Sequence, residues 1–530
     1  ELERMVDAVV AEIEDAQEDD GYLNTYFVFE SAPERWTDLT NKHELYCAGH
    51  LIQAAVAHHR ATGSERLLDV ARRFADHICD TFGPEGEGRR PGTDGHEEIE
   101  MSLIELYRDT GDPKYLEKAR YFLDARGHGL AGGDEYHQDH RPFREQDEMV
   151  GHAVRALYLN AGAADIYAET GEPALLETLE RLWRNMTTRR MYVTGGVGSR
   201  YEGEAFGADY ELPNACAYAE TCAAIANVMW NWRMLVLGGD ARYADLIENT
   251  LYNAVLPGIS LDGQSYFYQN PLADDGTHRR EPWFGCACCP PNVARLLASL
   301  PCYFYSASER SVWVHLYAGG EADVRIGEDR TIRLRQRTGY PWDGDVEIYV
   351  EGEGEFDLML RVPSWCEEDC AIEVNGEPLD EQAPPGSYTR VCREWHAGDA
   401  LRLRFPMPVR LVECHPYVAE NAGRVAIMRG PILYCVEQVD NPGVELRDLT
   451  LPVDAAFSTT FHPGLLGGVA VLSTRAEAVA SEKSWGDRLY RTRRDRGGDQ
   501  HTDKATLTAV PYYAWANREP GAMQVWLRSL

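Results

Sequence analysis

Hydrophobic and polar positions alternate with the 3.6-residue period of helices over the first 300 residues, and glycines mark where those helices end. Four short segments each place a glycine between an apolar stretch and a new polar turn: Ala61–Ser64, Asp109–Asp112, Glu169–Glu172 and Leu237–Asp240. Such a glycine closes a helix in the left-handed conformation, and the Ser, Asp or Glu after it favours the next helix start. The pattern predicts consecutive helical hairpins wound into an α/α toroid.

The predicted helices are of two kinds. Those before the glycines are apolar on most faces, as helices in the centre of a toroid are: Gly49–Ala61, Ile99–Tyr107, Ala153–Tyr167 and Ala223–Leu237. Those after the glycines, such as Glu65–Cys79, carry a single apolar face. This difference predicts an inner and an outer layer of helices.

After about Ser306 the hydrophobic period changes to two, which indicates strands. The alternation is clear in Ser311–Tyr317, Thr331–Arg335, Asp345–Val350, Phe356–Val362 and Ala400–Phe405. We predict a β-sandwich there and a second β region, with looser patterning, from about Leu411. The expected domains are a helical domain over 1–305, a β-sandwich over 306–410 and a second β-sandwich region over 411–530.

The net charge of the chain limits the kinds of partner that it can bind. The 530 residues carry a formal net charge of −34, which would repel nucleic acid and anionic membranes and favours a neutral substrate. No segment approaches the roughly 18 consecutive apolar residues of a membrane span. The 13 cysteines are odd in number and scattered, unlike the disulfide framework of a small secreted protein, so we predict a cytoplasmic location.

The richest motif is Gly285–Asn292, which holds Cys286, Cys288 and Cys289 just ahead of two prolines. Upstream, Glu220 and Cys222 lie two residues apart. Three thiolates and a carboxylate make a tetrahedral ligand set that suits zinc, whereas calcium or magnesium would take oxygen ligands only. A purely structural zinc site and buried free thiols remain alternatives at this point.

Other polar residues gather at predicted helix starts. His43, His96, His152, Glu220 and the Cys288–Cys289 pair each lie near the start of an inner helix, and an α/α barrel places those starts at one end. Taken together they predict a functional ring around one mouth. The glycine-rich loop Thr194–Arg200 lacks the features of a phosphate loop, so we expect it to help fold Glu204 inward. Two further candidates lie downstream, Glu248 and Tyr268.

These motifs, in this order, resemble glycoside hydrolase family 127, the bacterial β-L-arabinofuranosidases, over essentially the whole chain. The matching segments are Asp20–Phe27, His43–His50, Gly151–Arg155, Gly203–Phe206, Tyr218–Cys222, Cys286–Asn292 and Val510–Arg518. The resemblance implies an (α/α)₆ barrel followed by β-sandwich domains, and a retaining glycosidase whose nucleophile is a zinc-bound cysteine. The chain starts inside an amphipathic helix, so an N-terminal segment of the family pattern is expected to be missing.

Carried over by motif, the resemblance assigns roles to individual residues. Cys288 would be the nucleophile and Glu204 the acid/base, with the zinc shell formed by Glu220, Cys222, Cys288 and Cys289. The furanose hydroxyls would be held by His43, His96, His152, Glu248 and Tyr268, with His50 as an alternative to His43. For a retaining pair we expect the Cys288 sulfur within about 5–7 Å of the Glu204 carboxylate. The expected partner is a small oligosaccharide or glycoside, and a homodimer is left open.

Three rival functions stay open at this stage. A related furanosidase of different sugar specificity would share every motif. A sugar epimerase or an unsaturated-uronide hydrolase can use the same barrel with histidines and carboxylates, but neither needs Cys288 and Cys289. A non-catalytic, zinc-stabilised carbohydrate-binding protein would keep the thiols and not Glu204.

The excess of negative charge generates a first prediction. With five lysines among 52 basic residues, the composition is typical of a halophile or of an arginine-biased genome. If it reflects adaptation to salt, the melting temperature should rise as salt approaches 1 M, where the Debye length falls to about 3 Å. Thermal unfolding across a salt series measures this, and a flat melting temperature would favour the genomic explanation.

Overall fold

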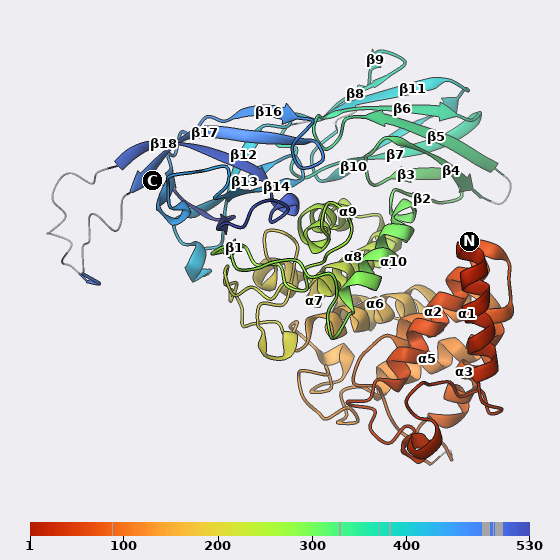
Figure 1. Cartoon of the computed structure of the whole chain (residues 1–530). Helices are drawn as coiled ribbons and strands as arrows, with labels where there is room; N and C mark the ends of the chain where they lie inside the picture. The colour runs from red at the N-terminus through yellow and green to blue at the C-terminus, as the bar shows by residue number, and fades with distance from the viewer. Residues whose placement is uncertain are drawn as a thin grey trace. The chain divides into compact units, whose positions relative to one another are not determined.

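The computed structural model describes residues 1–86, 88–327, 330–368, 370–380, 383–479, 488–490, 492 and 502–529. Figure 1 follows the chain from its helical N-terminal part to its strand-rich C-terminal part. Contacts group the chain into two compact units, 1–190 with 200–207, and 191–199 with 208–530. In the part of the chain that the structure describes, no helix is long and apolar enough to cross a membrane.

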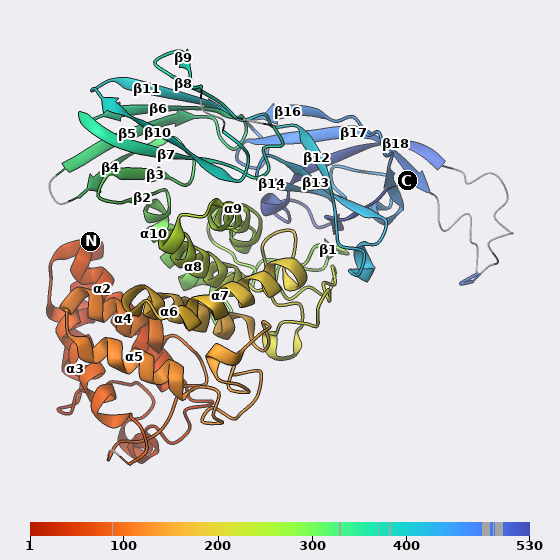
Figure 2. The ribbon, with the colours of Figure 1, turned by 180° about the vertical axis from the view of Figure 1, so that it is seen from behind.

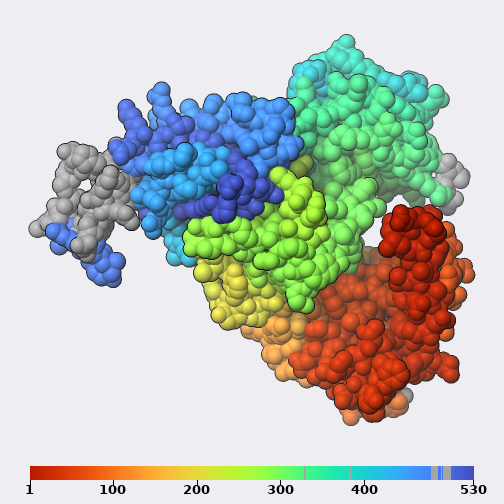
Figure 3. Space-filling view, viewed as in Figure 1, coloured from red at the N-terminus to blue at the C-terminus, as the bar shows by residue number. Residues whose placement is uncertain are grey.

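The first unit consists of helical hairpins, as the sequence predicts. Its helices are α1 (Leu2–Ala16), α2 (Glu44–Thr62), α3 (Arg66–Thr81), α4 (Ile99–Thr110), α5 (Pro113–Ala125), α6 (Ala153–Thr170) and α7 (Pro173–Asn185). Helix α2 pairs with α3, α4 with α5 and α6 with α7. Figure 2 shows α2, α4 and α6 side by side, and α4 contacts both of the others. Helix α1 packs against α3 and lies at the surface (Figure 3).

The predicted helix ends are confirmed. Gly63, Gly111, Gly171 and Gly239 each follow a helix in the left-handed conformation, with φ between 66° and 73°. Without a Cβ, glycine reaches this conformation at no steric cost. The Asp112 side chain then caps the next helix by accepting a hydrogen bond from the Lys114 backbone N–H at 3.1 Å. These short turns fold each inner helix back onto its outer partner.

The second unit begins with α8 (Thr221–Gly238), α9 (Ala241–Thr250) and α10 (Cys289–Ser299). Helix α8 packs against both α9 and α10. Most of the α8 side chains are buried, which fits its uniformly apolar sequence. The starts of α8 and α10 carry the cysteine motifs, so the packing of this helix pair decides where those side chains meet.

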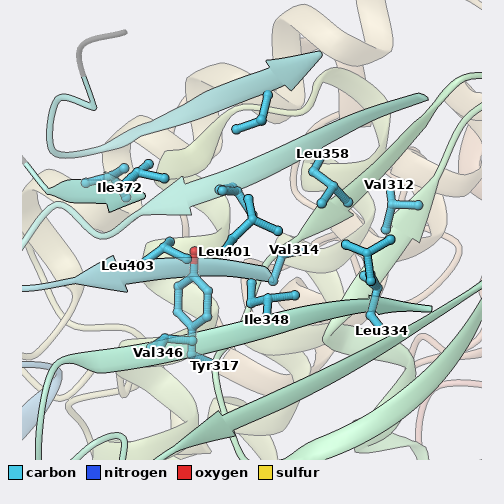
Figure 4. Packing of buried hydrophobic residues seen from close by; sticks show 14 of the residues in the cluster. Val312, Val314, Tyr317, Leu334, Val346, Ile348, Leu358, Ile372, Leu401 and Leu403 are labelled. Carbon is cyan, nitrogen blue, oxygen red and sulfur yellow. The ribbon is translucent and has the colours of Figure 1, made fainter. Parts of the chain in front are cut away.

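Two sheets follow the helices and share one hydrophobic core. The four-stranded sheet is formed by β2 (Tyr305–Ala307), β3 (Ser311–Val314), β7 (Gly354–Val362) and β10 (Ser387–Trp395). The six-stranded sheet is formed by β4 (Gly320–Ile326), β5 (Arg330–Thr338), β6 (Asp345–Glu351), β8 (Ala371–Val374), β9 (Glu377–Pro378) and β11 (Asp399–Arg404). Alternate side chains from both sheets, including Val314, Leu334, Ile348 and Leu358, fill the core (Figure 4).

The remaining strands form a ten-stranded sheet around two further hydrophobic clusters. Its strands are β1 (Ala273–Asp274), β12 (Val409–Glu413), β13 (Arg424–Arg429), β14 (Ile432–Glu437), β15 (Leu449–Leu451), β16 (Ser458–His462), β17 (Val469–Val479), β18 (Thr502–Pro511), β19 (Met523–Gln524) and β20 (Leu527–Ser529). Strand β1 comes from the loop between α9 and α10 and pairs with β19. The loop that leads to the cysteine motif is therefore attached to this sheet.

A buried ion pair ties α9 to the first two sheets. Glu248 on α9 accepts hydrogen bonds from Arg361 at 2.6 Å, from the Trp365 indole at 3.0 Å and from the Tyr340 hydroxyl. The Arg361 side chain is fully buried and also donates to Asp245. A buried charge without its partner is costly, so each member of this group depends on the others.

We expect Glu248→Ala to lower the free energy of unfolding by about 3–5 kcal/mol, because it leaves the Arg361 guanidinium buried beside one carboxylate fewer. Urea unfolding followed by tryptophan fluorescence measures the change. The exposed pair Asp323–Arg333 provides the control, since Asp323→Ala should cost about 1 kcal/mol or less. Equal losses in the two variants would contradict the structural role of Glu248.

Candidate active site

Three thiols and one carboxylate converge in the second unit. Glu220 is the N-cap residue of α8 and Cys222 lies in its first turn, while Cys288 is the N-cap residue of α10 and Cys289 its first residue. The Cys289 sulfur is 3.6 Å from that of Cys222 and 3.7 Å from that of Cys288. The Glu220 carboxylate is 3.4 Å from the Cys288 sulfur and 4.0 Å from the Cys289 sulfur. One ligand atom from each residue lies within 4.8 Å of all the others, so the four could hold a metal ion.

Burial separates Cys288 from the rest of this group. Glu220, Cys222 and Cys289 are 2%, 3% and 0% exposed, whereas Cys288 is half-buried. Cys288 therefore offers the one sulfur of the three that a ligand can approach. Cys286, which the sequence motif also contains, is exposed and stands outside the group of four.

The electrostatics of the sulfurs also differ. Hydrogen bonds from Cys222 and Cys289, with a further one from Tyr268, lower the pKa of Cys288 to about 2. Burial raises the pKa of Cys222 and of Cys289 well above the usual value for a thiol. The protein groups alone therefore favour a single thiolate, and they place it on the accessible sulfur.

A hydrogen-bonded loop holds Glu220 and Tyr268 in register. The Asn270 amide donates to the Ala219 carbonyl and to the Thr221 hydroxyl, both at 3.0 Å. The Thr221 backbone N–H donates to the Tyr268 carbonyl at 3.0 Å. Ala219 itself has φ of 38°, a left-handed conformation that is rare outside glycine and concentrates at functional sites. Tyr268 could be assigned from the sequence, whereas Asn270 was missed, because its only signal is an amide among aromatic residues.

The C-terminal motif Val510–Arg518 packs against the loop that carries Tyr268. Trp515 stacks on Phe267, the neighbour of Tyr268, with ring centroids 5.0 Å apart. Arg280 donates to the Trp515 carbonyl at 2.8 Å and to the Pro257 carbonyl. The Val510–Arg518 motif was noted in the sequence without a role, and its contacts explain it as a support for the Tyr268 loop.

The first unit brings together four of the predicted residues. His43 and His152 are the N-cap residues of α2 and α6, and His96 lies two residues before the N-cap of α4. The His96 ring centroid is 5.8 Å from that of His43 and 5.6 Å from that of His152. The His152 Nε2 atom lies 3.2 Å from a carboxylate oxygen of Glu204. Three histidines and a carboxylate thus form one polar group, here called the histidine cluster.

Two members of the histidine cluster have unusual backbones. His43 has φ of 53° and Glu204 has φ of 51°. Glu204 follows Gly203 in a short turn, and its side chain is one-third exposed. Non-glycine residues adopt this conformation at a cost that the surrounding structure has to offset, which is common where a side chain is aimed for function.

Burial and neighbouring charges keep His43 and His96 neutral. Burial, aided by the Arg155 cation, lowers the pKa of His43 to about 4. Burial, together with the neighbouring His152 and Arg155, lowers the pKa of His96 well below its ordinary value. Neutral imidazoles both donate and accept hydrogen bonds, which suits the recognition of sugar hydroxyls.

Two buried arginines hold the loop that carries His96. Arg155 donates to the Gly95 carbonyl at 2.6 Å. Arg126, which is fully buried, donates to the Asp94 side chain and backbone, each at 2.9 Å. Burial of the nearby Glu97 raises its pKa to about 7. In the sequence, Arg155 was noted only within the segment Gly151–Arg155 and Arg126 was missed, because nothing in their spacing connects them with His96.

Two of the sequence predictions have further contacts in the structure. The His43 ring lies beside that of His96, and His50 pairs with Glu98 at 3.4 Å. The Glu248 carboxylate accepts hydrogen bonds from Arg361, Tyr340 and Trp365, which give it a structural role. The assignments of His43 and Glu248 to the furanose stay predictions.

Comparison with known families covers nearly the whole chain. Residues 1–302 match the β-L-arabinofuranosidase GH127 catalytic domain, 311–407 the GH127 middle domain and 409–528 the glycoside hydrolase family 127 C-terminal domain. The non-reducing end β-L-arabinofuranosidase of Bifidobacterium longum is 38% identical over 100% of this chain and 85% of its own length.

Solved structures agree. A GH127 β-L-arabinofuranosidase from Geobacillus stearothermophilus T6 superposes with a TM-score of 0.94 at 44% identity, over 100% of this chain and 87% of that one. A second GH127 β-arabinofuranosidase gives a TM-score of 0.92 at 41% identity, over 100% and 84% of the two chains. The chain belongs to glycoside hydrolase family 127.

Proposed function

We propose that this protein is a retaining exo-glycosidase that hydrolyses non-reducing terminal β-L-arabinofuranosides with Cys288 as its nucleophile. The observation that carries this proposal is the accessible, hydrogen-bonded Cys288 sulfur within the group of Glu220, Cys222 and Cys289. The names of the family relatives support the sugar and the linkage. A glycoside substrate also agrees with the acidic chain, since a neutral sugar is not repelled.

We further propose the family architecture in detail. The helical hairpins would complete an (α/α)₆ barrel, and the strand regions would form two β-sandwiches. The domain limits would be 1–305, 306–410 and 411–530. Support comes from the hairpin pairing, from the core shared by two sheets, and from the matches to the catalytic, middle and C-terminal family domains.

The metal in this proposal is zinc, held by Glu220, Cys222, Cys288 and Cys289. Tetrahedral zinc, with Zn–S bonds of about 2.3 Å, places its sulfurs about 3.8 Å apart and a carboxylate oxygen about 3.5–3.6 Å from each sulfur. The sulfur–sulfur separations of 3.6 and 3.7 Å and the sulfur–oxygen separations of 3.4 and 4.0 Å suit that geometry. When bound, zinc would stabilise the thiolate form of Cys288 and so make it a better leaving group.

In the first step the Cys288 thiolate attacks the anomeric carbon while the bond to the leaving oxygen breaks. Glu204, protonated at this point, gives its proton to that oxygen. In the second step Glu204 removes a proton from water, whose oxygen attacks the anomeric carbon and releases the Cys288 thiolate. Two inversions give net retention.

The remaining side chains position these groups. His152 is close enough to hydrogen-bond Glu204 and hold it in its strained turn. Neutral His43 and His96 would hold the furanose hydroxyls, and Tyr268 would orient the Cys288 sulfur. For this mechanism the Cys288 sulfur and the Glu204 carboxylate have to lie on opposite sides of one anomeric carbon, about 5–7 Å apart.

Two general expectations stay predictions. None of the thirteen cysteines, all of which lie in the described part of the chain, forms a disulfide, as in proteins of a reducing compartment, which supports a cytoplasmic location. A homodimer is the assembly we would test first, because two-fold dimers are the commonest form of soluble oligomer.

We expect Cys288→Ser to lower kcat/KM on 4-nitrophenyl β-L-arabinofuranoside by about 10³-fold or more, as loss of a nucleophile does in other enzymes. A serine hydroxyl ionises far less readily than a thiol at neutral pH. Cys286→Ser, an exposed thiol outside the group of four, is the matched control and should keep wild-type activity. Comparable activity in the Cys288 and control variants would return Cys288 to a structural role.

The metal assignment is tested separately. Elemental analysis should find about one zinc per chain, because four protein ligands fill its tetrahedral shell. Cys222→Ser should lower that content and Cys286→Ser should not. Zinc below one-tenth of the chain concentration in protein purified without chelators would refute the site.

The loss of activity on replacing Glu204 should depend on how much the leaving group needs protonation. We expect Glu204→Gln to lower kcat/KM for an alkyl arabinofuranoside by about 10²–10⁴-fold, the usual worth of a general acid. The loss should be much smaller for a 4-nitrophenyl glycoside in the bond-breaking step, because nitrophenolate leaves without protonation. Glu202→Gln, two residues earlier and exposed, is the control. Equal losses on both substrates would remove Glu204 from the acid role.

A further inference from the structure

The Arg155 side chain is a buried cation beside the histidine cluster, and it pairs with no carboxylate in the described part of the chain. Arg155 is the third residue of α6 and is 5% exposed. Its guanidinium donates to the Gly95 carbonyl at 2.6 Å and lies over the Tyr136 ring, 4.4 Å from the ring centre. Desolvation of an ion costs several kcal/mol, which a buried cation–π contact of about 2 kcal/mol offsets only in part. Stability alone therefore does not account for a cation at this position.

Tyr136 connects this cation to His152 and to the turn that carries Glu204. The Tyr136 ring stands edge-to-face on the His152 ring, with centroids 5.7 Å apart. The His152 backbone N–H also donates to the Tyr136 carbonyl at 3.4 Å. A Cβ added to Gly203, the residue before Glu204, would lie 3.2 Å from a carbon of the Tyr136 ring. Glycine therefore lets the Glu204 turn rest directly on this ring.

The Glu204 turn is anchored at its base and strained at its tip. The Phe206 N–H, just after the turn, donates to the Gly151 carbonyl at 2.9 Å and ties the turn to the segment before α6. At the tip, Gly203 and Glu204 have φ of 70° and 51°. A non-glycine residue keeps such a φ only where its surroundings hold it there. The contact with the Tyr136 ring therefore helps to fix the direction of the Glu204 carboxylate.

The same guanidinium also holds the loop that carries His96. Gly95 precedes His96 and accepts the hydrogen bond from Arg155. The Gly95 N–H donates to the Leu39 carbonyl at 2.9 Å, so this peptide is held on both sides. One buried cation thus contacts both the His96 loop and the ring that supports the Glu204 turn.

We propose that Arg155 and Tyr136 are positioning residues, whose stacked side chains set where the Glu204 carboxylate lies relative to His96. They act through Glu204 and His96 and do not touch the reacting atoms. The proposal rests on the proposed function, because it takes Glu204 to be the acid and His96 to hold the furanose. A misplacement of about 1 Å can cost about 10²-fold in rate. Loosening the stack should therefore impair protonation of the leaving oxygen while the nucleophile stays in place.

The test compares an alkyl arabinofuranoside, whose leaving oxygen needs protonation, with the 4-nitrophenyl glycoside, whose leaving oxygen does not. Tyr136→Leu removes the flat ring and should lower the alkyl-to-nitrophenyl ratio of kcat/KM about tenfold or more. Tyr136→Phe keeps the ring and should keep the wild-type ratio. Arg155→Met should lower the ratio as Tyr136→Leu does and also raise KM for both substrates, because the Gly95 carbonyl loses its donor.

A variant that is merely less stable would lose activity on both substrates equally and keep the ratio. Tyr115→Leu is the matched control, since Tyr115 is a buried tyrosine of α5 with the Lys114 ammonium 4.9 Å from its ring centre. It should lower the melting temperature without changing the ratio. An unchanged ratio in both Tyr136→Leu and Arg155→Met overturns the proposal. So does a ratio lowered equally by Tyr115→Leu or by Tyr136→Phe, because the stack would then not be its cause.

Crystal structures of the two Tyr136 variants give a second readout that needs no turnover. In Tyr136→Leu the Glu204 carboxylate should move away from the His152 Nε2 atom, from which it lies 3.2 Å, whereas Tyr136→Phe should keep that distance. A displaced carboxylate supports the positioning role even if Glu204→Gln shows no dependence on the leaving group, in which case the proposed function alone fails. A carboxylate that stays in place in Tyr136→Leu refutes the positioning role.

Discussion

Four ionisable side chains, one carboxyl and three thiols, lie close together in the second unit, and their mutual repulsion when ionised is the main constraint on the surrounding structure. Two unit charges about 4 Å apart repel by about 4 kcal/mol at an effective dielectric constant of 20. Glu220, Cys222, Cys288 and Cys289 lie within such distances of one another. Full ionisation is therefore opposed unless a cation shares the site. Burial keeps the Cys222 and Cys289 thiols protonated, and their hydrogen bonds gather the negative charge on Cys288.

The same constraint explains the use of helix starts. The first backbone N–H groups of a helix have no partners within it, and together with the helix dipole they favour negative charge nearby. Glu220 and Cys288 are both N-cap residues, on α8 and α10. Because the two helices pack against each other, their starts bring together ligands that are 68 residues apart along the chain. The Asn270 amide then fixes the approach of the Tyr268 loop.

Features governed by local physics could be predicted from the sequence. The glycines that end α2, α4, α6 and α8 were identified, because a left-handed helix end has a strong residue preference. The inner and outer helices and the change to strands followed from hydrophobic period, and the ligand group followed from the chemistry of thiols and carboxylates. The histidines could be placed at helix starts because each lies near the beginning of a predicted inner helix, and the rings of His43, His96 and His152 do cluster.

Contacts between residues far apart in the chain could not be predicted from the sequence pattern. The family resemblance assigned Glu248 to the sugar, whereas its ion pair with Arg361, 113 residues later, has no counterpart in the sequence pattern. Arg126 and Asn270 were missed, and Trp515 was noted only within Val510–Arg518 and given no role, for a related reason. Each acts by contacting a segment far away in the chain, and periodicity describes only neighbours along a helix or strand. The Asp20–Phe27 motif was noted, but the pocket that it lines together with α2 becomes visible only in the folded chain.

Cys288 and Cys289 are adjacent at the start of α10, and the two sulfurs meet different requirements. A structural metal site gains from burying all of its ligands, whereas a nucleophile has to be reached by substrate. At the start of α10 the N-cap side chain stays partly accessible, and the side chain of the first helical residue is buried. Cys288 and Cys289 occupy these two positions, half-buried and fully buried in turn. Cys289 thus anchors the site with a buried sulfur, while the sulfur of the adjacent Cys288 stays accessible. Two cysteines far apart in the chain would need a second segment of the protein to hold them in this arrangement.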